Sequence, residues 1–394
     1  MSEYLNKLNY NHIVGDFMKI KMQRVFYPVG QGGFYSESFS TENSKFNVVY
    51  DCGSVSKGID KVISNSFDKN EDIDILFISH FDSDHVNKIN ILKNSVGKIK
   101  TVIMPLLSEE DKNFLLFVYK WLGSEYKNSL DILNNPKEFF GSETKIIWVR
   151  EVVESRDEEP NQEIRDVAEI EDGAEIKSGE NINFSLKGQK FWIYKPYNYK
   201  NKIRCKELIK KFRGNNISIK ELKDIDYISN HIKEIRKCYK EVEGNINQNS
   251  LVLYSNLIRY RDSTAYIYYF YMREDWKFYP FWRYYFLENR FDLGCIYTGD
   301  VHLKTIVDDF KNKIKGCKYY LPVNTIQVPH HGSKNGFDID FFNDFSEGRR
   351  RIISPISFGL SNPYGHPSGM VIKQLTLEHH LPVYVTNDKR DLFT

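Results

Sequence analysis

Four side chains that can bind metal ions follow directly after an apolar run, and this feature constrains the fold more than any other. The run 73–79 reads Ile-Asp-Ile-Leu-Phe-Ile-Ser, as expected of a buried strand. His80, Asp82, Asp84 and His85 follow it within six residues. Carboxylates and imidazoles at the end of a buried strand are costly to desolvate unless something compensates them. The spacing predicts that His80 and Asp82 hold one cation, and that Asp84 and His85 hold a second.

Three later segments also place polar side chains after apolar runs. Asp300 follows a short strand-like run and a glycine that allows close backbone approach, so its carboxylate is able to bridge two metal ions. His330 and His331 follow another such run; because adjacent side chains point apart, one of them ligates or donates a proton while the other packs. His366 lies in a turn-rich loop. Each alone also fits a turn or a surface histidine, but together they follow the order that a two-metal hydrolase needs.

The composition predicts a globular protein that works in a reducing compartment. Of its 394 residues 41% are hydrophobic and 27% are charged, and the net charge is +2, which neither favours nor excludes nucleic acid. The five cysteines are odd in number and contain no Cys-x-x-Cys pair, which argues against a disulfide framework. Residues 1–7 lack the apolar core of a signal peptide, and charges interrupt the apolar stretch 265–286. We therefore expect a cytoplasmic protein with no membrane partner.

Strand and helix patterns predict an α/β fold in two halves, 20–105 and 246–394. In the first half we expect two strands with a glycine hinge over 20–53, a helix at 57–66, and strands at 73–79 and 100–104. In the second half the expected strands are 250–254, 295–298, 325–328, 351–354 and 382–385. The intervening 106–245 is rich in Lys, Glu and Asn, with helical runs at 111–126 and 220–242 and an acidic loop at 151–175. We interpret it as a mainly helical insertion or cap.

These motifs together resemble the metallo-β-lactamase fold superfamily, and most of all the nuclease-like domain of ComEC-type DNA-uptake proteins. The matching segments, in family order, are 29–32 (Val-Gly-Gln-Gly), 51–53 (Asp-x-Gly), 80–85 (His-x-Asp-x-Asp-His), 249–253, 298–300 (Thr-Gly-Asp), 329–333 (Pro-His-His-Gly-Ser) and 362–367 (Asn-x-Tyr-Gly-His-Pro). The resemblance covers about 25–105 and 246–390, and it implies a four-layer αββα fold. Gly33 and 86–88 depart from the family pattern, and the membrane channel of the uptake proteins has no counterpart.

The resemblance also implies a centre with two divalent ions, zinc or manganese. Most of the superfamily has histidine where this chain has Asp82, and oxygen donors favour harder ions such as manganese. The implied ligands and catalytic groups are His80, Asp82, Asp84, His85, a bridging Asp300 and His366, with His330 and His331 as a general acid or an additional ligand and with Ser333 and Lys334 on the substrate phosphate.

The predicted function is a metal-dependent phosphodiesterase or nuclease acting on a nucleic acid or nucleotide through a water activated by two metal ions. One alternative is a hydrolase of non-phosphate esters or lactones, because fold does not fix function. Another is an effector gated by a regulatory protein partner. A third is a non-catalytic binding module, and the intact Asp84 argues against that third alternative alone. The aromatic block 266–286 has three interpretations: it stacks bases, it forms strands with one buried face, or it is a protein-binding surface.

Overall fold

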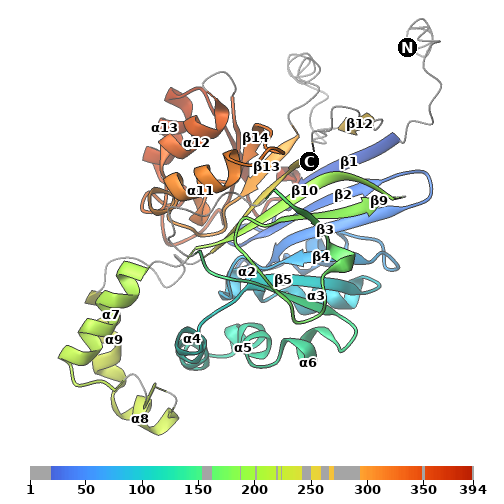
Figure 1. The fold of residues 1–394 in the computed structure, drawn as a ribbon. Helices are drawn as coiled ribbons and strands as arrows, with labels where there is room; N and C mark the ends of the chain where they lie inside the picture. Colours follow the sequence, from blue (N-terminus) through green and yellow to red (C-terminus); the bar gives the residue numbers. More distant parts are fainter. Residues whose placement is uncertain are drawn as a thin grey trace, which may run out of the picture.

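The computed structural model describes residues 19–152, 162–186, 188–199, 202–218, 221–222, 224–241, 250–258, 266–269, 293–347 and 351–392. These residues form a mixed α/β arrangement of two large sheets with helices (Figure 1), which confirms the α/β class. The strands are β1 (Lys19–Phe26), β2 (Phe34–Ser40), β3 (Lys45–Cys52), β4 (Ile73–Phe77), β5 (Ile99–Pro105), β6 (Lys145–Val149), β7 (Ile164–Asp166), β8 (Glu175–Ile176), β9 (Asn181–Leu186), β10 (Gln189–Asn198), β11 (Leu251–Leu257), β12 (Tyr266–Tyr269), β13 (Gly294–Tyr297), β14 (Val323–Ile326), β15 (Ile353–Ser357) and β16 (Leu381–Val385). The helices are α1 (Asp60–Ser64), α2 (Ser83–Val86), α3 (Ile89–Ser95), α4 (Glu109–Leu122), α5 (Lys127–Asn134), α6 (Pro136–Phe140), α7 (Lys202–Gly214), α8 (Ile225–Asn230), α9 (Ile232–Glu241), α11 (Val307–Lys315), α12 (Ile339–Ser346) and α13 (Gly369–Leu377).

The first sheet has the strand order β12-β1-β2-β3-β4-β5-β6-β8. Its strands β1, β2 and β3 pair antiparallel, whereas β3, β4, β5 and β6 run parallel. Parallel strands end at the same edge of a sheet, and ligands bind at that edge in open α/β sheets. The end of β3 at Cys52 and the residues just beyond β4, including His80, therefore lie on one edge.

The second sheet has the order β16-β15-β14-β13-β11-β10-β9-β7, and β13 to β16 run parallel. Asp300 lies just beyond β13 and His330 just beyond β14, so they share an edge. This edge meets that of the first sheet, because the backbone N–H of Leu251 donates to the carbonyl of Ser79 over 2.7 Å. Residues far apart in the sequence are thus gathered where the two edges join.

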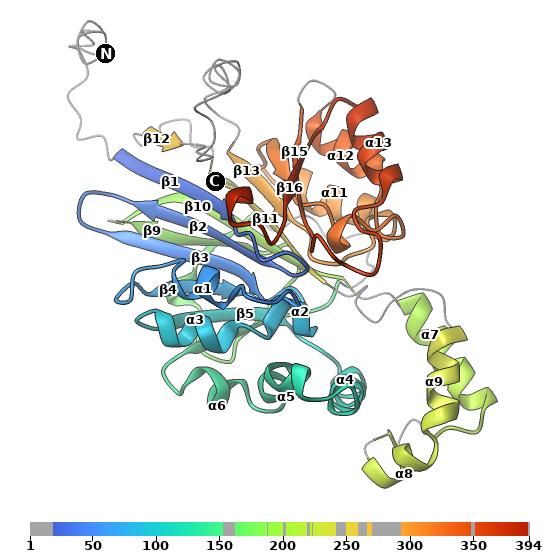
Figure 2. The ribbon, with the colours of Figure 1, turned by 180° about the vertical axis from the view of Figure 1, so that it is seen from behind.

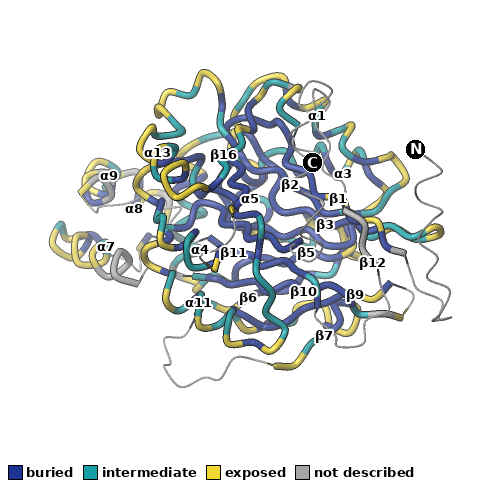
Figure 3. The backbone as a smooth tube through the Cα atoms, turned by 90° about the horizontal axis from the view of Figure 1, so that it is seen from above, coloured by how far each residue is buried: buried dark blue, intermediate teal, exposed yellow. Residues whose placement is uncertain are grey.

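Apolar side chains fill three regions around the two sheets. Residues of both sheets, such as Phe77 and Trp192, form one buried cluster between them. A second cluster joins the other face of the first sheet to helices that include α3 and α4, and a third joins the second sheet to α11, α12 and α13. Strand β4 contributes to both faces, which explains why its sequence is a continuous apolar run. Figure 2 shows the helices outside the sheets, and Figure 3 shows that buried residues concentrate in the strands.

Strand β2 was not predicted, since the sequence indicated two strands over 20–53 and the structure has three there. Its sequence, Phe-Tyr-Ser-Glu-Ser-Phe-Ser, carries a charged residue in the middle. Glu37 is nevertheless buried between the sheets, where it pairs with Arg24 at 2.8 Å and accepts a hydrogen bond from Tyr194. Burial of a carboxylate is tolerated when it is paired and fully hydrogen-bonded. The strand was missed because these partners come from β1 and β10.

The segment 106–245 differs from the predicted mainly helical insertion. Its first part forms α4, α5 and α6, but 145–198 supplies strands to both sheets. Within the described residues only α7, α8 and α9 project away from the sheets (Figure 1). The strands were missed because polar and basic residues interrupt them: β10 contains a lysine that is buried in the structure, Lys195. Of the predicted acidic loop, 153–161 lies outside the described residues, and the remainder includes β7 and β8.

The predicted aromatic block lies mostly outside the described residues. Its first residues form β12, which pairs parallel with β1 at the edge of the first sheet. Among the helices that the structure describes, none combines the length and the apolar character that crossing a lipid bilayer requires.

Candidate metal centre

The motif 80–85 leaves the end of β4 and turns at once into the short helix α2. His80 precedes the turn, whereas Asp84 and His85 lie within the helix. Asp82 occupies the N-cap position, yet its side chain accepts no capping hydrogen bond there. The simplest non-functional explanation, an aspartate that caps a helix, therefore does not account for this residue.

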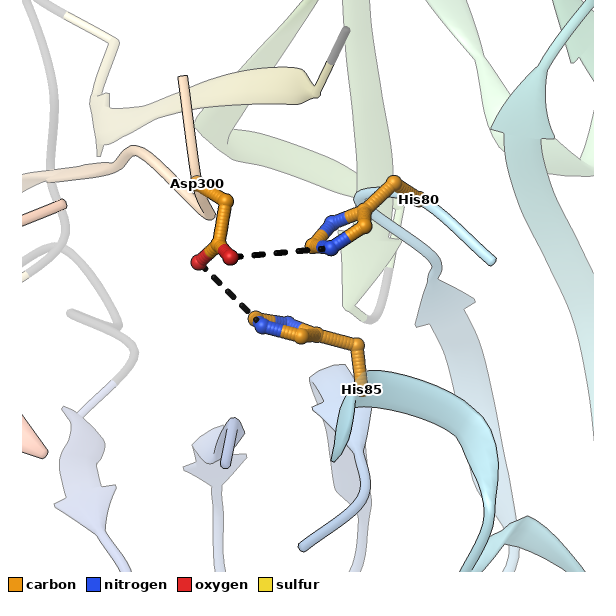
Figure 4. A group of neighbouring side chains, drawn as sticks. All are labelled: His80, His85 and Asp300. Carbon is orange, nitrogen blue, oxygen red and sulfur yellow. Dashed lines mark ion pairs between the residues drawn. The ribbon is translucent and has the colours of Figure 1, made fainter. Parts of the chain in front are cut away.

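His80, His85 and Asp300 converge from three places in the chain (Figure 4). His80 Nε2 lies 3.9 Å from Asp300 Oδ2, and His85 Nε2 lies 3.3 Å from Asp300 Oδ1. All three side chains are buried. The backbone N–H of Asp300 donates to Ser250 Oγ over 3.1 Å, which holds the carboxylate where β11 begins. The carboxylate and the two imidazoles form a compact set of donors from both sheets.

Asp51 and Ser79 determine how the two imidazoles are protonated. His85 Nδ1 lies 2.8 Å from Asp51 Oδ2, so it must donate its proton to that carboxylate. The Ser79 hydroxyl donates to the same oxygen over 2.7 Å, and it therefore accepts from His80 Nδ1 at 2.9 Å. Both rings thus present Nε2 towards Asp300. A carboxylate that orients a histidine through its other nitrogen is a recurrent feature of metal sites.

The inward-facing atoms of this group fit a cation. His80 Nε2, His85 Nε2 and Asp300 Oδ1 are buried, and none of them has a hydrogen-bond partner among the described residues. Buried polar atoms without partners are rare and costly in folded proteins. Two imidazole nitrogens and a carboxylate oxygen are ligands that zinc and manganese accept. A divalent ion would satisfy all three atoms at once.

A second group of donors comprises Asp84, His85 and His331. His331 Nε2 lies 3.1 Å from Asp84 Oδ2, while its Nδ1 lies 2.8 Å from the carbonyl of Ser357. That carbonyl fixes the proton on Nδ1, so Nε2 is directed at the carboxylate. Burial alone would raise the pKa of Asp84, but the charges of His85 and His331 hold it below its ordinary value. The second group adjoins the first because His85 belongs to both.

Asp82 lies in neither group, and the predicted pairing of His80 with Asp82 therefore differs from the arrangement found. Its Oδ1 accepts a hydrogen bond of 2.6 Å from the hydroxyl of Tyr119 on α4. Burial, followed by the charge of Asp84, raises the pKa of Asp82 to about 7. His85 takes the place beside His80 that the spacing assigned to Asp82. The short helix α2 is responsible, because it turns the chain sharply between the two residues.

His330 and His331 both have left-handed backbone conformations, with φ of 47° and 54°. Such values are uncommon outside glycine and are found at functional sites, where surrounding structure maintains them. The turn directs both rings at the centre, since His330 Nε2 lies 3.8 Å from Asp300 Oδ2. The expectation that one of the two packs elsewhere was therefore wrong. His330 differs from its neighbour in being partly exposed, at 24% of its side chain.

The remaining predicted residues line the outer side of the centre. The His366 ring lies 5.9 Å from that of His330, centroid to centroid, and it belongs to neither donor group. Burial, together with the nearby His330 and His331, lowers the pKa of His366 to about 4, so its ring is neutral near pH 7. Ser333, two residues after His331, is buried, and Lys334 is exposed.

The structure adds four residues that sequence reasoning did not select. Asp51 and Ser79 orient the ligating histidines, Ser250 holds Asp300, and Tyr119 holds Asp82. Asp51 had a signal, since it begins the Asp-x-Gly motif at the end of β3, and Ser250 belongs to the matched segment 249–253. Tyr119 had none, because its role depends on how α4 packs.

The comparison with protein-family models gives no match, and neither does the comparison with curated proteins. The geometry described above therefore carries the functional argument.

Metal binding is expected to release a proton at pH 7. Burial alone would lower the pKa of His85, but the carboxylates of Asp300, Asp51 and Asp84 outweigh it and raise the pKa well above the ordinary value. Metal-free protein therefore carries a proton on Nε2 at pH 7, and a cation must displace it. Titration calorimetry with manganese in buffers of different ionisation enthalpy should give about one proton released per His85-bound ion. Binding enthalpies that do not depend on the buffer would contradict this.

Proposed function

We propose that this protein is a metal-dependent phosphodiesterase with the four-layer αββα metallo-β-lactamase fold. The apolar clusters between and outside the two sheets support the layering. The observation that carries the function is the pair of adjoining donor groups, with buried ligand atoms that lack partners among the described residues. Structural sites for a single zinc ion are usually closed by four ligands, whereas the two groups together contain five donor residues, more than one such ion takes, and this suits a two-metal hydrolase.

The residues of the two groups would hold the ions. His80, His85 and Asp300 form one set, and Asp84 with His331 extends it to the other side of His85. Two bound divalent ions would activate a water for attack on phosphorus and neutralise charge on the phosphate oxygens. The protein contributes the orientation of its donors, because Asp51 and Ser79 keep a proton on Nδ1 of His85 and His80 and so leave Nε2 of each ring for an ion.

We assign different roles to the two adjacent histidines, a ligand role to His331 and a proton-donor role to His330. His331 has its Nδ1 proton committed to the carbonyl of Ser357, so its Nε2 is suited to act as a ligand. His330 is partly exposed and close to Asp300, and it can exchange protons with solvent. We therefore assign to His330 the proton that the departing oxygen of the substrate requires. Lys334, which is exposed three residues beyond the pair, is available to a phosphate oxygen.

The donor set contains both carboxylates and imidazoles, and this bears on the choice of metal and substrate. Asp84 and Asp300 supply carboxylates to the two groups, and oxygen donors suit manganese as well as zinc. Such ions bind phosphate oxygens strongly, which favours a phosphodiester in a nucleic acid or nucleotide over an uncharged ester.

Hydrolysis assays on metal-depleted and reloaded protein test this function. We expect bis-p-nitrophenyl phosphate and labelled DNA or RNA to be cleaved after manganese or zinc is restored, and not in chelator. Single- and double-stranded substrates compared in parallel identify the preferred form. If folded, metal-loaded protein hydrolyses p-nitrophenyl esters or lactones but leaves every phosphodiester intact, the proposal is wrong and the ester alternative replaces it.

A further inference from the structure

The helices α7, α8 and α9 (202–241), here called the helical arm, leave and rejoin the protein at the metal centre. The arm follows β10, whose last residue, Asn198, pairs with Leu251 at the start of β11. Ser250, one residue earlier, contacts both Asp300 and His80 Nδ1, the latter at 3.3 Å. The base of the arm is therefore at the sheet edge that carries the candidate ligands. Figure 1 shows the arm extending outwards from this edge, beyond α4.

The arm has a small core of its own and rests on α4. Phe212, Ile235 and Cys238 belong to that core, and Phe114 and Phe117 of α4 pack against it. The same helix carries Tyr119, which holds Asp82 at the metal centre. The arm is thus connected to the centre through one rigid element.

The arm concentrates positive charge that the rest of the chain lacks. Residues 202–241 contain twelve lysines and arginines against six aspartates and glutamates, a net charge of +6. The whole chain has a net charge of +2, so the remainder carries −4. Lys210 and Arg213 on α7 and Lys233 on α9 are among its exposed basic residues. Such local charge attracts polyanions even when the protein as a whole is nearly neutral.

We propose that the helical arm binds the phosphate backbone of a nucleic-acid strand and holds it at the metal centre. This inference rests on the proposed function and narrows its substrate to a polymer. Trp121 is 45% exposed and lies one turn after Phe117 on the same face of α4, beside the arm, where a base can stack on it. An anionic membrane is a poorer fit, because surface-binding helices insert exposed apolar faces, whereas here Phe212 and Ile235 are buried within the arm.

The test is binding of a labelled single-stranded DNA 20-mer to the full-length protein in chelator, where cleavage is blocked. The variant Lys210→Gln/Arg213→Gln/Lys233→Gln should bind about tenfold more weakly, with a salt-dependence slope smaller by about 2. The matched control, Lys21→Gln/Lys69→Gln/Lys98→Gln, removes three exposed charges near the starts of β1, β4 and β5, at the opposite end of the first sheet from the metal centre, and should bind like wild type.

Hydrolysis of the small substrate bis-p-nitrophenyl phosphate tests the catalytic activity of the metal centre independently of nucleic-acid binding by the arm. The arm variant should hydrolyse this substrate at the wild-type rate, because it is too short to reach the arm. Wild-type affinity and salt slope in the arm variant would overturn the inference, as would equal losses in the control variant. Failure of wild type to cleave any phosphodiester would reject the proposed function, while the binding comparison would still decide whether the arm holds nucleic acid.

Discussion

Replacing Asp300 by asparagine is expected to lower kcat/KM for phosphodiesters by about 10³-fold, which corresponds to about 4 kcal/mol of transition-state stabilisation. The carboxylate faces His80 and His85 and has one oxygen without a hydrogen-bond partner among the described residues. Burial raises its pKa, but His330 and His85 hold it well below its ordinary value, so it is ionised at neutral pH. Asparagine keeps the shape and removes the charge. Steady-state kinetics and metal analysis of the purified variant measure both consequences.

The control is Asp308→Asn, in the first turn of α11, where the side chain is exposed and belongs to neither donor group. It should leave kcat/KM and metal content unchanged. Asp300→Asn protein that binds two metal ions and retains wild-type turnover would exclude this carboxylate from the centre.

A strand could be predicted from the sequence when its own residues are as apolar as the surroundings in which the fold buries them. Strand β4 meets this condition, because both of its faces are buried against apolar neighbours and its sequence becomes an apolar run. Strands β2 and β10 do not, because each contains a charged residue that the fold buries, Glu37 and Lys195, and the partners of Glu37 come from other strands. A sequence pattern records the polarity of a side chain, whereas these strands depend on partners that only the folded chain supplies.

The candidate site divides in the same way. His80, Asp84, His85 and Asp300 follow strands that are visible in the sequence, so their convergence could be predicted from the rule that parallel strands end at one edge. Which of these residues form each donor group could not be predicted, because that depends on the direction in which each side chain points. The hydroxyl of Tyr119, from a helix 37 residues further along the chain, holds Asp82 outside both donor groups, and no local pattern encodes that contact.

Replacing Asp51 by asparagine is expected to weaken metal binding by 10–100-fold, although Asp51 is not itself a ligand. Its carboxylate accepts hydrogen bonds from the Ser79 backbone N–H, the Ser79 hydroxyl and His85 Nδ1, over 2.7, 2.7 and 2.8 Å. Asparagine has only one acceptor oxygen. When that oxygen takes the Ser79 N–H, the amide group faces His85 Nδ1 as a donor.

The tautomer of His85 then reverses. Nδ1 accepts from the new amide, the ring proton moves to Nε2, and Nε2 donates to Asp300 Oδ1 across the 3.3 Å that now separates them. In wild-type protein a cation displaces the Nε2 proton because Asp51 holds the remaining ring proton on Nδ1, whereas in the variant the amide donor opposes a proton on Nδ1 and the proton therefore stays on Nε2. Titration calorimetry with manganese should detect the loss of affinity directly.

The variant Asp74→Asn is the control for general destabilisation. It distinguishes a loss of metal affinity caused by lower stability from one caused by the changed protonation of His85. Asp74 is another buried carboxylate, which accepts from the Asn47 N–H and from Lys100, and it lies near the start of β4, at the opposite end from His80. Both substitutions should lower the melting temperature of metal-free protein, because each removes charge-assisted hydrogen bonds. Only Asp51→Asn should weaken manganese binding. Equal losses of affinity in the two variants would mean that Asp51 acts through stability alone, and that the tautomer of His85 is set by something else.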